Sequence, residues 1–206
     1  MVGTPSGVTL SHEGGAHQSI ITPNIGMSQP NLDYYEPTYA DELSFLFFWA
    51  LENIQAKNGK SVYFRLSTKK LVQPDRTLSN SLKNDLIKGG YWFYKPKKKL
   101  DLLFICTGVI VGEVLNALEA MKEDNLNIGL FIVSSPDRLY QDWLESTKKT
   151  NFTSFIESQL SIIEISTPII TIIDGHSSSL SWIGSVKGQR IIPVSYTHLT
   201  LPTTTI

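Results

Sequence analysis

Three short apolar runs, separated by helical and turn signals, constrain the fold of this chain more than any other feature. The runs are Leu102 to Cys106, Ile128 to Val133 and Pro168 to Ile173. Their length and their content of branched residues favour buried strands. After the first run, apolar residues recur at helical spacing, at Val111, Val114, Leu115, Leu118 and Met121. Alternation of strand and helix predicts an α/β fold with a mainly parallel sheet covered by helices.

A further helix is predicted earlier in the chain, from Tyr39 to about Ile54. It is apolar on nearly every side, through Leu43, Phe45, Leu46, Phe47, Phe48, Trp49, Leu51 and Ile54. A helix of this kind has to be buried all round. In a chain of 206 residues, we therefore expect another chain or a further domain to cover it. Ser61 to Leu66 follows as a predicted strand, because it is rich in β-forming residues.

Two other segments show no apolar period. The first thirty-odd residues are rich in Gly, Pro, Ser, Thr and Asn, which predicts a long loop, and long loops in compact domains are often functional. Gln73 to Ile87 is polar and is followed by Gly89 and Gly90. That pattern predicts a linker between two units.

Composition excludes several classes of function. The net charge of −1 gives no support to nucleic-acid binding, which needs a clustered basic excess. The one dense basic run, at Lys95, Lys97, Lys98 and Lys99, is predicted to be a solvated turn. No apolar stretch reaches the ~18 residues of a membrane span. Cys106 is the single cysteine and is expected to be a buried apolar residue of a strand.

The last thirteen residues, Val194 to Ile206, break the pattern. They are polar and rich in threonine. The stretch Val194 to Thr203 also resembles the translation of a transposase adapter used to prepare sequencing libraries. We therefore expect residues 194–206 to add nothing to the fold.

The segment from Ser11 to Ser19 carries the most distinctive chemistry. It reads Ser-His-Glu-Gly-Gly-Ala-His-Gln-Ser, and its glycines allow the backbone to approach a ligand closely. Glu13 and His17 lie four residues apart, and an imidazole can donate or accept a proton near neutral pH. On these residues alone, an ordinary loop histidine and a catalytic one both stay open. His12, Glu13 and His17 do not have the spacing of a zinc site such as H-E-x-x-H.

This segment resembles the D-G-x-x-H-Q signature of the transketolase superfamily, with Glu13 at the acidic position and His17 at the histidine. Further along the chain, the family's P-N-L and P-x-x-A-x-E patterns and its later strands and turns are matched by Pro30 to Leu32, Glu36 to Glu42, Val62 to Thr68, Lys88 to Tyr91, Thr107-Gly108 and Thr167 to His176. The resemblance covers Gly3 to about Pro193. It implies the end of a thiamine-diphosphate pyrimidine-binding domain followed by a transketolase C-terminal-like α/β domain.

Within the superfamily, the chain is most similar to the homodimeric type of pyruvate dehydrogenase E1 component. Sugar-phosphate transketolases carry an arginine directly after the Leu-Ser of the strand, where it pairs with the substrate phosphate, whereas this chain has Leu66-Ser67-Thr68. Lys69 lies nearby, but a fixed bidentate phosphate clamp is a property of arginine. Tyr39 and the stretch Gln141 to Trp143 also resemble the E1 branch.

The resemblance implies boundaries at 1–78 for the pyrimidine-binding part, 79–90 for a linker, 91–193 for the C-terminal-like domain and 194–206 for the tail. It also implies thiamine diphosphate and Mg²⁺ as cofactors, with their main binding motifs outside this chain, since no Gly-Asp-Gly triplet is present. His17 would be catalytic, Glu13 and His17 would bind substrate, and no residue here would bind cofactor or metal.

The activity implied is decarboxylation of a 2-oxo acid, pyruvate, and transfer of the acyl group to a lipoyl domain. The implied partners are a second E1 subunit, in a homodimer, and a lipoyl-bearing E2 acyltransferase, with no nucleic acid and no membrane. The expected location is the cytoplasm, and the chain is expected to be inactive alone. Two alternatives stay open, namely part of a transketolase acting on sugar phosphates and a non-catalytic interaction module.

Overall fold

The computed structural model describes residues 1–3, 7 and 19–195. Within them the strands are β1 (Val2–Gly3), β2 (Leu32–Tyr35), β3 (Ser61–Arg65), β4 (Gly90–Tyr94), β5 (Leu102–Thr107), β6 (Ile128–Val133), β7 (Ile169–Ile172) and β8 (Ile191–Val194). The helices are α1 (Thr22–Ser28), α2 (Ala40–Gln55), α3 (Asn80–Lys88), α4 (Val111–Ala120), α5 (Pro136–Lys148), α6 (Phe155–Leu160) and α7 (Ser178–Ser181). Three short 3-10 helices are η3 (Gly108–Ile110), η4 (Met121–Asp124) and η5 (Trp182–Val186).

The larger sheet has five strands in the order β4-β6-β5-β7-β8. Strands β6, β5, β7 and β8 run parallel, and β4 pairs antiparallel with β6. This arrangement confirms the predicted α/β fold with a mainly parallel sheet. The three apolar runs of the sequence form β5, β6 and β7, which lie side by side in the sheet. They are continuously apolar because strands in such a sheet are buried on both faces.

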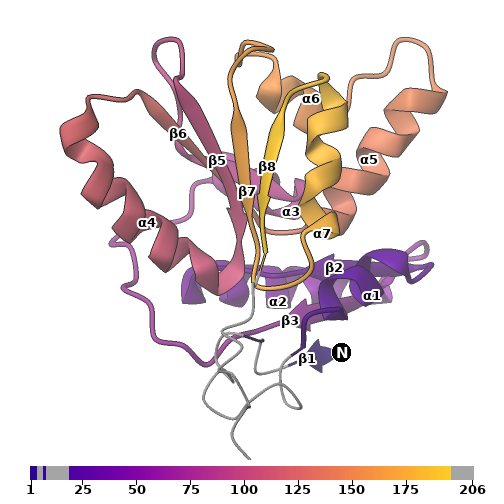
Figure 1. The fold of residues 1–206 in the computed structure, drawn as a ribbon. Coiled ribbons are helices and arrows are strands. Elements are labelled where there is room, and N and C mark those ends of the chain that lie inside the picture. The colour runs from indigo at the N-terminus through magenta and orange to yellow at the C-terminus, as the bar shows by residue number, and fades with distance from the viewer. Residues whose placement is uncertain (4–6, 8–18, 196–206) are drawn as a thin grey trace, which may run out of the picture.

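Helices cover both faces of this sheet (Figure 1). On one face α4 packs through Val111 and Val114 on alternate residues of β5 and β6. On the other face α5, α6 and α7 bury a second core, which includes Leu139, Ile156 and Leu180. The lysine run at 95–99 is exposed beside the sheet, as predicted.

The smaller sheet has three parallel strands in the order β1-β3-β2. Its residues Tyr35 and Phe64 pack with Leu46 of α2 in the same core cluster as Phe104 of β5 and Leu130 of β6. The two sheets are therefore joined by one continuous apolar core. The small sheet and α2 lie beneath the carboxyl ends of the parallel strands of the large sheet (Figure 1).

Helix α2 begins one residue after predicted and ends one residue later. The helix was expected to be buried on every side, but within this chain only Glu42, Leu46 and Ala50 of α2 are buried. Phe48 is 64% exposed, and three further apolar residues stay open: Phe47, Leu51 and Ile54. One side of α2 packs against the small sheet. The side that carries these exposed residues is not covered by any described residue of the chain.

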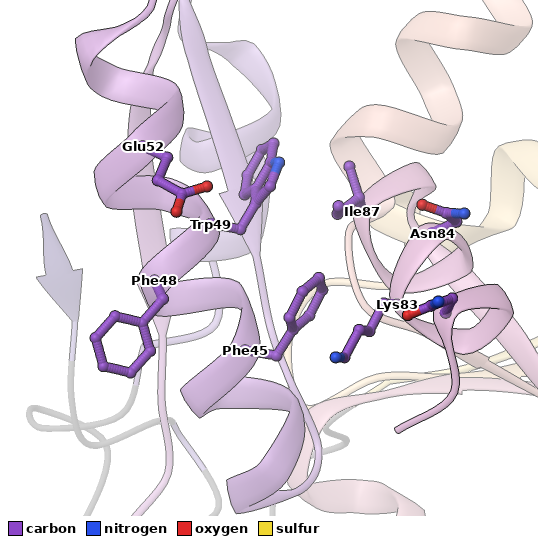
Figure 2. Close-up of a pocket in the computed structure, with 8 residues that line it drawn as sticks. Phe45, Phe48, Trp49, Glu52, Lys83, Asn84 and Ile87 are labelled. Atoms are coloured by element: carbon purple, nitrogen blue, oxygen red, sulfur yellow. The ribbon is translucent and has the colours of Figure 1, made fainter. Parts of the chain in front are cut away.

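A groove of about 510 Å³ runs between α2 and α3. Figure 2 shows Phe45 and Trp49 of α2 facing Lys83 and Ile87 of α3 across it. The ammonium of Lys83 lies 5.6 Å from the centre of the Phe45 ring. Phe48 points to the outer side of α2, away from α3.

Three sequence predictions need correction. The expected linker at 79–90 is largely the helix α3, which Ser79 caps by accepting from Leu82 N at 3.2 Å and Gly89 ends at φ +119°. The long N-terminal loop contains α1 and is followed by β2, whose four residues are too short to reveal a period. The expected tail starts too early, because Val194 pairs with Ile172 as the last residue of β8.

Candidate functional site

Glu13 and His17, the site residues predicted from the sequence, lie outside the described residues. The described residues that flank them, Gly7 and Ser19, lie close to one another. A Cβ atom at Gly7 would lie 3.6 Å from the carbonyl oxygen of Ser19 and 3.1 Å from Oδ1 of Asp174. Asp174 follows β7, so both flanks of the segment meet the large sheet at the end of one of its central strands.

Arg65 lies at the centre of this region. It is the last residue of β3, and its side chain is only 2% exposed. The guanidinium donates from Nη1 to Glu36 Oε1 at 2.7 Å and from Nη2 to the carbonyl oxygen of Asp174 at 2.6 Å. It also donates from Nη2 to Ser19 O at 3.1 Å and from Nε to Thr22 Oγ1 at 3.1 Å.

Four strand ends supply the residues of this region. Glu36 directly follows β2, Arg65 ends β3, Gly108 follows β5 and Asp174 comes two residues after β7. Gly108 has φ +62°, and a Cβ atom there would collide with the Glu36 carboxylate. In addition, Thr38 Oγ1 donates to Gly108 O at 3.3 Å. The carboxyl ends of parallel strands are a common place for ligand sites in α/β folds.

The charges of this region are buried together. Burial raises the pKa of the Glu36 carboxyl, while the Arg65 guanidinium and the Tyr34 hydroxyl oppose that rise. Burial lowers the pKa of Arg65, but the carboxylates of Glu36 and Asp174 and the hydroxyl of Tyr34 outweigh it, and the net pKa is raised. Arg65 Nη2 also lies 3.7 Å from Asp174 Oδ2. Such a buried cluster is costly to break, because removing one partner leaves an uncompensated charge.

The sequence and the fold of this chain are similar to those of known proteins. No protein-family model matches the chain. A transketolase of Buchnera aphidicola is 31% identical over 165 residues, which is 77% of this chain and 24% of the relative. A pyruvate dehydrogenase E1 component of Pseudomonas aeruginosa is 27% identical over 65% of this chain and 15% of its own length.

The chain belongs to the transketolase superfamily. It spans about a quarter of the length of the Buchnera transketolase. The solved transketolase of Campylobacter jejuni superposes with a TM-score of 0.65 at 17% identity, covering 88% of this chain and 25% of that one. A structure described as a split-gene transketolase, an inactive β4 tetramer, gives 0.57 at 17% identity, covering 94% and 55%. These structures show that the superfamily fold extends over most of this chain.

A second buried cluster of this superfamily member joins α2 to the large sheet. Glu42, which is fully buried, accepts from Arg76 Nη2 at 2.8 Å, from Thr38 N at 2.9 Å and from the Tyr91 hydroxyl. Arg76 also binds Asp41 from Nε at 2.8 Å. The sequence placed Glu42 only within a family pattern. Its partners come from three separate segments, so the spacing of residues along the sequence could not predict that they contact Glu42.

Asp174 lies in a bend shortly after β7. It is 1% exposed and binds Arg65 through its backbone and side chain. His176 is exposed, and its Nδ1 lies 2.8 Å from Ser178 Oγ at the start of α7. His176 is thus a surface residue beside the first residue of α7.

Arg65 was missed by the sequence reasoning. The signal was available, since an arginine stood in a predicted strand of mostly apolar residues, where a charge needs a buried partner. Among the described residues, no group of three His, Cys, Asp or Glu side chains could hold a metal ion. In the same part of the chain, no helix is both long and apolar enough to cross a membrane.

Proposed function

We propose that this chain is part of a thiamine-diphosphate-dependent E1 component, which decarboxylates pyruvate and passes the acyl group to a lipoyl domain. The proposal rests on superfamily membership and on the E1-like features of the sequence around Tyr39 and Leu66. The similarity to the Pseudomonas E1 component supports it. A second E1 subunit and a lipoyl-bearing E2 acyltransferase are the partners proposed, in the cytoplasm.

One observation carries the choice of substrate class. A phosphate clamp would need a free, fixed guanidinium near the end of β3, where the sequence has Leu66-Ser67-Thr68. Arg65 points into the interior and is bound to Glu36, Asp174, Ser19 and Thr22. Lys69 forms an ion pair with Glu113. Arg65 and Lys69 are thus bound to protein partners, and Lys70 is an exposed ammonium and not a fixed bidentate clamp. This arrangement favours a 2-oxo acid without a phosphate group.

His17 is the proposed acid–base residue, and Glu13 is proposed to orient it or to touch the substrate. His17 would hydrogen-bond the substrate oxygen and move a proton as charge develops there, which is worth roughly 10²–10⁴-fold in rate. Both residues lie outside the described part of the chain, so their roles rest on the sequence signature. The main binding motifs for thiamine diphosphate and Mg²⁺ are proposed to lie outside this chain, as the superfamily resemblance implies.

A transketolase acting on sugar phosphates is the second candidate, favoured by the 31% identity to the Buchnera transketolase. The two candidates are separated by assaying the complete enzyme with both substrate classes. We expect pyruvate-dependent CO₂ release and acylation of a lipoyl domain, with no ketol transfer between sugar phosphates. Ketol transfer without CO₂ release from pyruvate would reject the E1 assignment in favour of transketolase. The 206-residue chain assayed by itself is expected to release no CO₂.

A further inference from the structure

We propose that Arg65 is a positioning residue of the proposed active site, which holds the chain next to His17 against the strand ends of both sheets. This inference rests on the proposed role of His17. The residue touches neither substrate nor cofactor in the proposal. It acts by holding Ser19 and Thr22, which follow His17 in the sequence.

Arg65 binds residues that closely follow His17 in the sequence. Ser19 lies two residues after His17, and its carbonyl oxygen accepts from Arg65 Nη2 at 3.1 Å. Thr22 Oγ1, three residues further on, accepts from Arg65 Nε at 3.1 Å and from Ser19 Oγ at 2.5 Å. One guanidinium therefore holds this stretch at two points immediately beyond His17.

The same guanidinium also binds residues at strand ends of both sheets. Nη1 binds Glu36 at the end of β2, and Nη2 binds the carbonyl of Asp174 beyond β7. A separate backbone bond, from His176 N to Ile20 O at 2.9 Å, fastens the same stretch to the large sheet. The chain beside His17 is thereby tied to both sheets at once, which is the kind of rigid support that a positioned acid–base group needs.

The geometry of its hydrogen bonds explains why residue 65 is an arginine. Its planar group carries five donors in a fixed fork, whereas a lysine ammonium is a compact point charge. A lysine at this position can keep an ion pair with Glu36, but it cannot also reach Thr22, Ser19 and Asp174 from their different directions. The variant R65K therefore keeps the buried charge and loses the grip on the chain beside His17.

A buried bridge with a purely structural role is the competing explanation. It predicts that R65K lowers kcat by the same factor whether or not His17 is present. A positioning role predicts that R65K lowers kcat much less once His17 has been replaced by alanine. A double-mutant cycle separates the two cases, because coupled residues give non-additive effects. The control is R76K, since Arg76 also joins two segments through buried Glu42 but makes no bond to residues 19–22.

The experiment measures kcat and the unfolding midpoint for the complete enzyme and for H17A, R65K, R76K and H17A/R65K. We expect R65K to lower kcat by roughly 10–100-fold, in line with the cost of a small misplacement, and by less than threefold when His17 is already alanine. R76K is expected to change kcat by less than threefold at a similar loss of midpoint. Equal losses from R65K in both backgrounds would overturn the positioning role. A loss below tenfold in H17A would instead reject the proposed function, and this inference with it.

Hydrogen exchange on the 206-residue chain tests the grip without any assay of activity. R65K should raise exchange at the amide of His176, which donates to Ile20 O, at least tenfold above the global unfolding rate, whereas R76K should not. Unchanged protection in R65K would show that Arg65 does not hold this stretch, and would overturn the inference even if H17A is inactive.

Discussion

The hydroxyl of Tyr91 in β4 donates to Glu42 at the start of α2, so a residue of the large sheet stabilises a buried carboxylate of the helix beneath it. Burial raises the pKa of the Glu42 carboxyl, and the hydrogen bonds from Tyr91 and Arg76 oppose that rise. The contact joins segments 49 residues apart. It makes the packing of α2 dependent on the position of β4.

Y91F should therefore lower the free energy of unfolding by about 1.5–3 kcal/mol, the usual contribution of a hydrogen bond to a charged group. The matched control is Y94F, because Tyr94 lies in the same strand with its side chain 49% exposed, and it should change stability by less than about 0.5 kcal/mol. Urea unfolding of both variants measures this. Equal effects of the two changes would show that the Tyr91–Glu42 bond adds nothing.

Asp137 gives a prediction about pH. Burial raises the pKa of its carboxyl to about 6, with the nearby Asp33 adding to the rise and the backbone N–H of Tyr34 and the charge of Lys60 opposing it. The folded state thus binds the proton more tightly than the unfolded state does, and the stability from this group falls as pH rises from about 4 to 6. D137N should raise the unfolding free energy at pH 7 by about 1–3 kcal/mol.

The gain in D137N should shrink as the pH is lowered toward 4, because the wild-type carboxyl is then protonated as well. Unfolding curves at pH 4, 5, 6 and 7 measure the difference between D137N and wild type. D75N serves as the control at an exposed aspartate. A gain in D137N that stays constant with pH would contradict the raised pKa.

Gly108 and Gly188 form a matched pair for backbone strain. Both have positive φ, at +62° and +70°, but a Cβ atom at Gly108 would meet the Glu36 carboxylate and one at Gly188 meets nothing within 4 Å. G188A should cost about 1–2 kcal/mol from the left-handed conformation alone. G108A should cost clearly more, because it also displaces the partner of Arg65. Similar losses in thermal unfolding would mean that the strand end is not tightly packed.

Truncation tests the boundary of the fold near the C-terminus. Because Ile191 to Val194 pair with β7 and Ile191 packs against the core, removal of residues 191–206 should destabilise the chain by about 1–3 kcal/mol. Removal of residues 196–206 alone should change stability by less than about 0.5 kcal/mol. A large loss from the shorter deletion would contradict the adapter interpretation of these residues.

Strands β5, β6 and β7 could be predicted because each is a continuous apolar run buried on both faces. Helix α4 followed from its period, and α2 from its apolar length. Strand β2 was hidden because its core residues, Tyr34 and Tyr35, lie in a stretch of only four residues. Helix α3 was hidden because it is polar, and its ends are set by Ser79 and Gly89.

The candidate site was harder to predict for a different reason. Arg65, Glu36 and Asp174 are far apart in the sequence, and each reads locally as something ordinary: a strand residue, a residue before proline and a turn. Only the meeting of two sheets at their strand ends brings them together. The superfamily signature named Glu13 and His17, but spacing along the chain holds no information on what supports them.

The most direct test of the catalytic role of His17 is the turnover of the H17A variant of the complete enzyme with pyruvate, measured together with its unfolding midpoint. We expect kcat to fall roughly 10²–10⁴-fold, as for loss of one acid–base group, while stability falls by about 1 kcal/mol or less. A fall of less than tenfold, or one only in proportion to the folded fraction, would contradict the assignment of His17.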